Sequence, residues 1–325
     1  MITLTVAIVS LYVPGRRHSV EDYGYDLSNL LVRQDLMAAT GRGRLEIRPL
    51  NNPLTLSVAE LDEANEKGRG KLLVSADRVV GVVVGGESRA YPLRAMNWHE
   101  VVNDTLGGIP IAVTYSPLSD SVVVFDRRLG EEVLEFRHSA LLYNSNLLMQ
   151  NWKEGAESDP DFNPSLFSQL QFRAISGPHA GQELTVLPME VTTWGAWKEK
   201  LPETRVIRGL EDYEQRKLYR KNPYGPYLLT GELKFPAQPL PAGAEQDPKT
   251  RMARVLALAN DAGGWNRSFL SDLASMAEAP VRVHDSNEYI VFEFPAAPTQ
   301  PAVYACNFAW HAVRFEIENS APTSE

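Results

Sequence analysis

The sequence is poor in cysteine, and this scarcity limits the chemistry that it can support. Cys306 is the single cysteine among 325 residues. One thiol cannot form an intramolecular disulfide, and it cannot build a zinc or iron–sulfur site that needs several cysteines. The lack of disulfides does not assign a compartment, because exported proteins can also fold without them.

Positive charge is also in short supply. The chain has 32 Lys and Arg residues against 41 Asp and Glu residues, which gives a formal net charge of −9. Such a chain repels phosphate overall and is a poor partner for nucleic acid unless its cations cluster. The basic runs at 42–44 and 216–221 are short and read as solvated faces. We therefore expect no nucleic acid among the partners.

An apolar, uncharged stretch opens the chain, but it is short. Met1 to Val13 falls below the ~20 residues that a membrane-spanning helix needs, and no basic residues precede it as in a secretory signal. We interpret it as a trimmed anchor, a shallow membrane insertion or a β-strand. The prediction is an extracytoplasmic or periplasmic-side protein with peripheral membrane contact through residues 1–13, and the cytoplasm is the alternative.

Several motifs of enzymes and cofactor-binding proteins are missing. The chain has no Walker loop, no Gly-x-Gly-x-x-Gly that opens a helix and no serine within Gly-x-Ser-x-Gly. His99-Glu100 begins like the zinc-binding His-Glu-x-x-His motif, but Asn103 stands where the second histidine is needed. The other histidines show no paired ligand spacing. No cofactor and no metal is expected.

Short strands between turns dominate the rest of the chain. Its 22 prolines and 22 glycines predict many turns. Arg78 to Val84 is β-branched, Gly85-Gly86 suits a hairpin turn, and Ser88 to Pro92 returns as the partner strand. Further strands are predicted at 109–115, 122–125, 133–136 and 141–148. The fold is predicted to be mainly β with short helices (α+β), in a barrel- or sandwich-like arrangement.

A few short helices are predicted as well. Ser57 and Glu60 form a capping box for a helix over 57–64. The segments 32–39 and 93–102 are also compatible with short helices. Trp194 and Trp197 lie three residues apart and share one face if helical, so they are candidate core, interface or binding residues.

A long internal repeat suggests a duplicated β unit. The segment 252–258 parallels 78–84, and the segment 279–294 mirrors 109–125. We predict two β-rich halves around one core. The proposed division is an N-terminal apolar segment and irregular lead-in at 1–70, a first half at 71–224, a Pro-rich connection at 225–248 and a shorter second half at 249–325.

Three motifs resemble a bacterial family. They are Arg89-Ala-Tyr-Pro-Leu93, Trp98-His-Glu-Val-Val-Asn-Asp104 and Pro110-Ile-Ala-Val-Thr-Tyr115. Together they are similar to the family catalogued as domain of unknown function 3179, with coverage from about Leu72 to Phe315. The family has no assigned activity, so the resemblance implies a fold more than a function.

The resemblance also implies a redox site that this chain has lost. Many relatives carry cysteine, and some selenocysteine, just after the motif tyrosine, where this chain has Ser116. Some carry a second cysteine at the place of Ser119. A serine hydroxyl does not ionise like a thiol and cannot cycle through a disulfide. The candidate catalytic residues are Ser116, Ser119, His99 and Glu100.

Three functional hypotheses follow. The leading one is a non-catalytic accessory or interaction protein, a subunit of a larger assembly that works through protein partners, with a membrane complex as one host. The alternatives are an enzyme of thiol or selenium redox ancestry, and a binder of a small molecule or metal ion in a groove near His99, Asp104 and Asp120. The candidate binding residues are Asn103, Asp104, Asp120, Trp194 and Trp197.

Overall fold

The computed structural model describes residues 18–68, 71–156, 158–159, 161–209, 217–286 and 289–320. The apolar stretch from Met1 to Val13 lies outside these ranges, so its interpretation as a membrane contact or a strand stays a prediction. No helix within the described ranges is both long and apolar enough to span a membrane.

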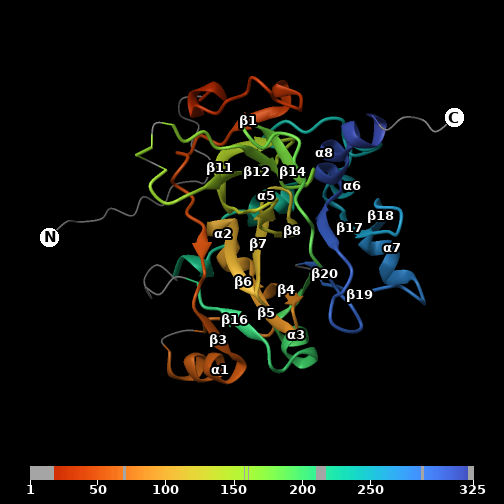
Figure 1. The fold of residues 1–325 in the computed structure, drawn as a ribbon. Helices are drawn as coiled ribbons and strands as arrows, with labels where there is room; N and C mark the ends of the chain where they lie inside the picture. The colour runs from red at the N-terminus through yellow and green to blue at the C-terminus, as the bar shows by residue number, and fades with distance from the viewer. Residues whose placement is uncertain are drawn as a thin grey trace.

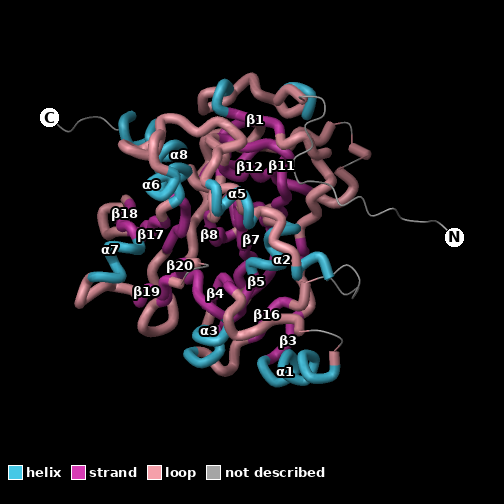
Figure 2. Tube along the Cα trace, turned by 180° about the vertical axis from the view of Figure 1, so that it is seen from behind, coloured by secondary structure: helices cyan, strands magenta, loops and turns pink. Residues whose placement is uncertain are grey.

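Three stacked sheets make up most of the fold (Figures 1 and 2). The central sheet has the strand order β18 (Trp265–Phe269), β17 (Arg254–Ala259), β21 (Ala302–Cys306), β8 (Ser121–Asp126), β7 (Ile109–Ser116), β6 (Val101–Leu106), β2 (Leu50–Asn51). Its strands pair in antiparallel fashion except for β2 and β6, which are parallel.

A second seven-stranded sheet and a five-stranded sheet flank the central one. The seven-stranded sheet has the order β19 (Arg282–Asp285), β20 (Ile290–Glu293), β15 (Glu190–Thr193), β4 (Arg78–Val84), β5 (Glu87–Pro92), β16 (Arg205–Ile207), β3 (Thr55–Ser57). The five-stranded sheet has the order β1 (Met37–Ala39), β11 (Glu135–Tyr143), β12 (Asn146–Trp152), β13 (Leu166–Ser168), β14 (Arg173–Ser176). A small ribbon pairs β9 (Arg128–Leu129) with β10 (Glu132–Val133).

The central sheet is buried on both faces, which explains its continuous apolar strands. Along β8, Val123 and Phe125 enter the core against the five-stranded sheet. The alternate residues Val122 and Val124 enter the core against the other seven-stranded sheet. Successive side chains of a strand point to opposite faces, so a strand between two cores needs apolar residues at every position. The prediction of a mainly β, sandwich-like fold is confirmed, and the described sheets do not close into a barrel.

Two helices cover the outer face of the second seven-stranded sheet. They are α1 (Val58–Lys67) and α3 (Trp194–Lys200), at the bottom of Figure 1. Helix α1 begins with the predicted capping box, because the Ser57 hydroxyl accepts from the Glu60 amide while the Glu60 carboxylate accepts from the Ser57 amide. A Cβ on Gly81 would lie 2.3 Å from the ring of Trp197, so only glycine lets β4 approach this helix so closely.

The lead-in before residue 58 is more ordered than predicted. Its three short strands β1, β2 and β3 each add an edge strand to a different sheet. The helix predicted at 32–39 was wrong, because this stretch forms a 3-10 turn over Gln34–Leu36 and then β1. Strands of two or three residues are too short for a period to show in the sequence.

The segments 78–84 and 252–258, which suggested a repeat, each contribute to the first strand of a hairpin that is followed by a helix. Strands β4 and β5 turn at Gly85-Gly86, where both φ angles are positive, and lead into α2 (Leu93–His99). Strands β17 and β18 lead in the same way into α7 (Leu270–Ser275). The two hairpins lie in different sheets, so strands from both sides of the connection share each seven-stranded sheet. The domain boundaries themselves stay a prediction.

The segment 217–252, which includes the predicted connection at 225–248, packs over strand ends. It contains the 3-10 helix η3 (Lys217–Arg220), α5 (Gly225–Thr230) and α6 (Pro248–Met252). A small apolar cluster joins it to the turn after β7 and to the end of β11: Leu118, Leu142, Tyr224 and Tyr227. The last helix, α8 (Asn307–Ser320), follows β21 and packs into the core between the five-stranded and central sheets.

Candidate functional site

The turn between β7 and β8 presents a buried carboxylate, Asp120. The backbone of Asp120 has a φ of 38°, in the left-handed region, which aspartate tolerates better than most residues. This turn aims the carboxylate at β4 and β17, which lie in different sheets. Residues more than a hundred positions apart in the sequence therefore meet at one carboxyl group.

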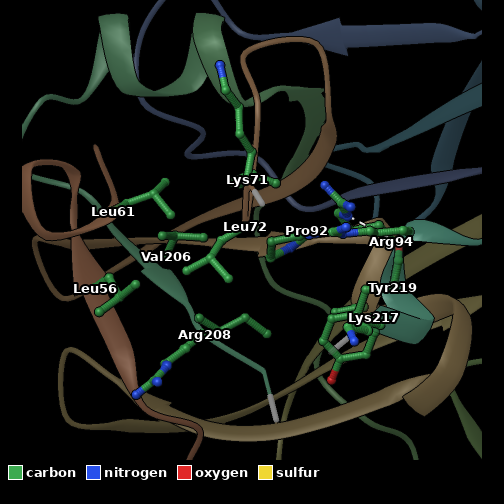
Figure 3. Close-up of a pocket in the computed structure, with 14 residues that line it drawn as sticks. Leu56, Leu61, Lys71, Leu72, Pro92, Arg94, Val206, Arg208, Lys217 and Tyr219 are labelled. Atoms are coloured by element: carbon green, nitrogen blue, oxygen red, sulfur yellow. Dashed lines mark hydrogen bonds between the residues drawn. The ribbon is translucent and has the colours of Figure 1, made fainter. Parts of the chain in front are cut away.

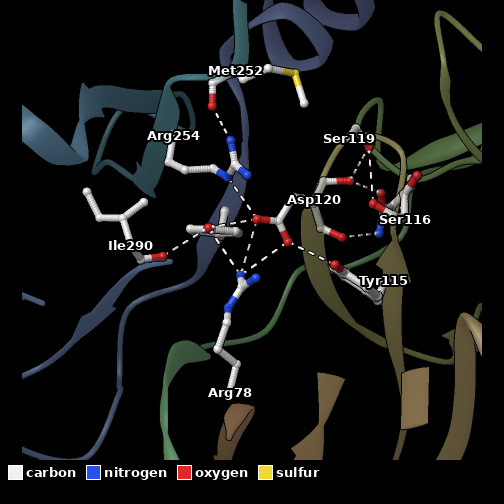
Figure 4. Close-up of polar contacts among 11 residues, drawn as sticks. Arg78, Tyr115, Ser116, Ser119, Asp120, Met252, Arg254 and Ile290 are labelled. Carbon is white, nitrogen blue, oxygen red and sulfur yellow. Dashed lines mark hydrogen bonds and ion pairs between the residues drawn. The ribbon is translucent and has the colours of Figure 1, made fainter. Parts of the chain in front are cut away.

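Asp120 lies between two arginines (Figure 4). Arg78 Nη2 is 3.1 Å from Oδ1, and Arg254 Nε is 2.8 Å from Oδ2. The hydroxyls of Tyr115 and Tyr304 lie 2.9 and 3.0 Å from the same carboxylate. Burial raises the pKa of Asp120, but the two guanidinium groups outweigh burial and lower the pKa to about 2. The carboxylate is ionised at neutral pH.

This cluster forms the floor of a large cleft. The cleft has a volume of about 570 Å³, within the range of small-molecule sites. Leu93, Leu228, Leu229 and Ile290 supply apolar surface along its walls. The Leu229 side chain is 86% exposed, which is unusual for a leucine of this size. The cleft therefore combines an ionic floor with an apolar wall.

The charge of the cleft is opposite to that of the chain. Its lining includes five cationic side chains and two carboxylates, so it has a formal excess of three positive charges: Arg78, Arg94, Arg220, Lys221 and Arg254 against Asp77 and Asp120. Arg94 pairs with Asp77 at 2.8 Å. The side chains of Arg220 and Lys221 are exposed and make no hydrogen bond or ion pair with any described residue. These two cations are free to meet an anion that enters.

A second buried carboxylate, Glu100, lies on the other side of Tyr115. Its backbone carbonyl accepts from the Tyr115 amide, and its carboxyl group lies 3.3 Å from both His138 Nε2 and the Tyr224 hydroxyl. Burial raises the pKa of Glu100 to about 8, although Tyr224 and Arg42 oppose the shift. The residue has a φ of 59°, so its backbone is strained.

The hydrogen bonds of His138 fix its tautomer. Its Nδ1 accepts from the Ala140 amide at 2.6 Å, so the proton of the neutral ring lies on Nε2 and points to Glu100. Burial and Arg42 lower the pKa of His138 to about 3. Neither ring nitrogen is left to take a proton from a neighbouring hydroxyl.

A family model described as "Protein of unknown function (DUF3179)" matches residues 53–312. The chain belongs to this family. No curated protein and no solved structure matches the chain. The family match confirms the resemblance seen in the motifs around Tyr91, Trp98 and Tyr115, while the thiol or selenol ancestry of the site stays a prediction.

In this DUF3179 protein, the structure brings two of the predicted catalytic residues together. Ser116 ends β7 and lines a cavity of about 10 Å³ with Glu100 and His138. Such a cavity has room for about one water molecule. Ser116 is 1% exposed. A hydroxyl in this enclosed position, beside a histidine without a free nitrogen, lacks the base that a serine nucleophile needs.

Ser119 belongs to a separate buried network. Its hydroxyl lies 2.9 Å from the Ser121 hydroxyl and accepts from Asn146 at 3.0 Å. Asn146 also donates to Gln169, whose amide in turn donates to Thr114. These bonds cross-link β7, β8 and the β11–β12 hairpin, which gives Ser119 a structural role.

His99 lies at the end of α2 and is also fully engaged. Its Nδ1 donates to the Arg48 carbonyl at 2.8 Å, so Nε2 accepts from the Tyr219 hydroxyl at 2.7 Å. Burial lowers the pKa of His99, although the Arg48 carbonyl opposes the shift. Of the predicted groove residues His99, Asp104 and Asp120, only Asp120 lines the large cleft.

The other predicted binding residues are held inside the fold. Asn103 bonds the backbone of Phe136 through both ends of its amide. Asp104 pairs with Arg89 at 2.6 Å and accepts from the Tyr91 hydroxyl at 2.9 Å. Both residues are buried. Their contacts explain these positions by folding alone.

The two tryptophans also face the interior. Trp194 and Trp197 are 1% and 0% exposed, and the Trp197 indole donates to Thr204 at 2.8 Å. They belong to the core beneath α1. This outcome agrees with the core-anchor interpretation and leaves no surface for a ligand cage at these residues.

Cys306 is buried, and burial raises the pKa of its thiol to about 12, so it stays protonated. In the described part of the chain, no group of three or more His, Cys, Asp or Glu side chains is arranged to hold a metal ion.

A smaller pocket lies beside the cleft (Figure 3). Its volume is about 40 Å³, and its floor is apolar, formed by Leu56, Leu61, Leu72 and Val206. Arg94, Tyr219 and Arg220 line both this pocket and the large cleft. These shared side chains form the wall between the two hollows.

Proposed function

We propose that this protein is a non-catalytic binding protein that holds a small organic anion in the cleft above Asp120. The main observation in favour is the excess of positive charge around a cleft of about 570 Å³, in a chain whose net charge is −9. A cleft lined by one sign of charge concentrates ligands of the opposite sign. The apolar wall favours an anion with a hydrocarbon part over a bare inorganic ion.

The floor of the cleft supports this role because it is already organised. Asp120 holds Arg78 and Arg254 in place, and both guanidinium groups keep donors that Asp120 does not use. Arg78 Nε is buried and has no hydrogen-bond partner in the described part of the chain. A fixed arrangement of donors lowers the entropy that ligand binding costs.

Ser116, Ser119 and Cys306 are not activated as nucleophiles, which supports a non-catalytic role. Ser116 is enclosed beside a histidine whose two nitrogens are occupied, Ser119 is bound in a structural network, and the Cys306 thiol stays protonated. Protein partners and a place on the extracytoplasmic or membrane side stay predictions from the sequence.

Calorimetric titration tests the proposal. Phosphate, succinate and octanoate would be titrated into the wild type and into the double variant Arg220→Gln/Lys221→Gln. Since a hydrogen bond to a charged group contributes about 1.5–3 kcal/mol, we expect the double variant to bind at least tenfold more weakly. Binding to the wild type should weaken with added salt.

The matched control removes the same charge elsewhere. Lys249 and Arg282 are exposed and do not line the cleft, so Lys249→Gln/Arg282→Gln should bind like the wild type. The proposal is wrong if none of the three anions binds, or if both double variants lose affinity equally.

A further inference from the structure

One segment, residues 217–230, forms a complete wall of the cleft. Its contributions include the cations Arg220 and Lys221, and the apolar Leu228 and Leu229. This wall carries the two cations that are free to meet a ligand. Where the wall sits therefore decides where those charges point.

The wall is fastened to the fold through two tyrosine hydroxyls. Tyr219 donates to His99 Nε2 at 2.7 Å, and Tyr224 donates to Glu100 Oε1 at 3.3 Å. His99 and Glu100 are consecutive residues at the end of α2. A third contact comes from the same helix, because Arg94 Nε donates to the Tyr219 carbonyl at 3.2 Å.

His99 and Glu100, the acceptors of these two hydrogen bonds, are themselves held by further contacts. His99 is held by the Arg48 carbonyl, and Glu100 is held by His138, which is in turn held by the Ala140 amide. Two of these supports are backbone atoms, which cannot rotate away. The ring tautomers follow from the same contacts, so each tyrosine meets an acceptor of fixed position.

We propose that His99 and Glu100 are positioning residues for the cationic wall of the cleft, an inference that rests on the proposed function. The two residues do not reach the ligand. They hold Tyr219 and Tyr224, and these hold Arg220 and Lys221 over the Asp120 floor. The His-Glu sequence, which looks like half of a zinc motif, thereby gains a role that needs no metal.

The test removes only the two hydroxyls. Tyr219→Phe/Tyr224→Phe keeps both rings and should raise amide hydrogen exchange across residues 217–230 at least tenfold. The same variant should bind octanoate about three- to tenfold more weakly, because the wall must be ordered again on binding. If His99 acts through Tyr219, the two substitutions should not be additive. The double variant His99→Phe/Tyr219→Phe should therefore bind octanoate less than twofold more weakly than His99→Phe alone.

A third tyrosine supplies the control. The Tyr25 hydroxyl is also buried and donates to the Ser139 carbonyl at 2.8 Å, but Tyr25 does not line the cleft. Tyr25→Phe should change neither the exchange of 217–230 nor the affinity.

The outcomes separate this inference from the proposed function. Unchanged exchange in Tyr219→Phe/Tyr224→Phe overturns the anchoring, whatever the ligand. Increased exchange with unchanged affinity, while Arg220→Gln/Lys221→Gln loses affinity, overturns the positioning role alone. If the wild type binds none of the anions, the proposed function falls, and the exchange experiment still decides the anchoring.

Discussion

Two buried carboxylates flank one tyrosine of β7 and differ sharply in charge. Asp120 accepts from the Tyr115 hydroxyl, and the Glu100 carbonyl accepts from the Tyr115 amide. The pKa of Asp120 falls to about 2 because two arginines outweigh burial. Burial raises the pKa of Glu100 to about 8, because the opposing effects of the Tyr224 hydroxyl and of Arg42 are smaller. Burial alone does not determine whether an acid is ionised; the nearest full charges do.

The largest expected effect comes from neutralising Asp120. Asp120→Asn keeps the shape of the side chain but leaves the partly buried Arg78 and Arg254 without a counter-charge. We expect a loss of about 3–5 kcal/mol in the free energy of unfolding at pH 7, measured by urea denaturation. The carboxylate stabilises the fold above its ordinary pKa near 3.8 and loses this effect as pH falls toward 2. The difference between variant and wild type should therefore shrink over that range.

Asp104 is the matched control for this change. It is buried too, but it pairs with a single arginine, Arg89, and with the Tyr91 hydroxyl. Asp104→Asn should lower the free energy of unfolding clearly less than Asp120→Asn does. Equal losses would mean that the second arginine contributes nothing.

Neutralising Glu100 should raise the free energy of unfolding at high pH, whereas neutralising Asp120 lowers it. The folded pKa of about 8 lies above the ordinary value of 4.5, so the folded protein holds a proton that the unfolded chain releases between these values. Wild-type stability should fall as pH rises through this window. Glu100→Gln cannot ionise, and at pH 9 it should be more stable than the wild type by on the order of 2–4 kcal/mol, measured by urea denaturation.

At pH 4.5 the Glu100→Gln variant and the wild type should be nearly equal in stability. Glu190 offers the contrast, because burial raises its pKa to about 7 even though Lys200 pairs with it. Glu190→Gln leaves that lysine unpaired and should not stabilise the protein at pH 9. A Glu100→Gln variant that is less stable than the wild type at pH 9 would contradict a neutral Glu100.

The smallest expected effect is the difference in stability loss between removing the Tyr304 hydroxyl and removing the Tyr224 hydroxyl. Tyr304 donates to the ionised Asp120, whereas Tyr224 donates to the mostly protonated Glu100. At pH 7, Tyr304→Phe should cost about 1.5–3 kcal/mol and Tyr224→Phe about 0.5–1.5 kcal/mol. Urea denaturation of the two variants measures both. Equal costs would show that the two carboxyl groups have the same charge.

Local features of the fold were predictable from the sequence. Strand β4 has the predicted bounds, Gly85-Gly86 turns where expected, and α1 starts at its capping box. Each of these depends on residues within a few positions of one another. The turn that splits 141–148 was missed, although Asn144 was a usable signal, because asparagine tolerates the positive φ that it adopts there.

The site was much less predictable. Asp120 was a candidate, but its partners Arg78 and Arg254 lie 42 and 134 positions away, and no local pattern links them. His138 shows no paired ligand spacing in the sequence, and its contact with Glu100 depends on packing between two sheets. Ion pairs between residues that are far apart in the chain produce no periodic pattern in a single sequence.

The three edge strands of the lead-in have a consequence for solubility. The border of a sheet exposes unpaired amide and carbonyl groups that can join another chain. Strands β1, β2 and β3 each occupy one such border, so residues 37–57 protect β11, β6 and β16 from intermolecular pairing. Removal of residues 37–57 would expose three sheet edges at once, so we expect the truncated chain to aggregate more readily than the full chain.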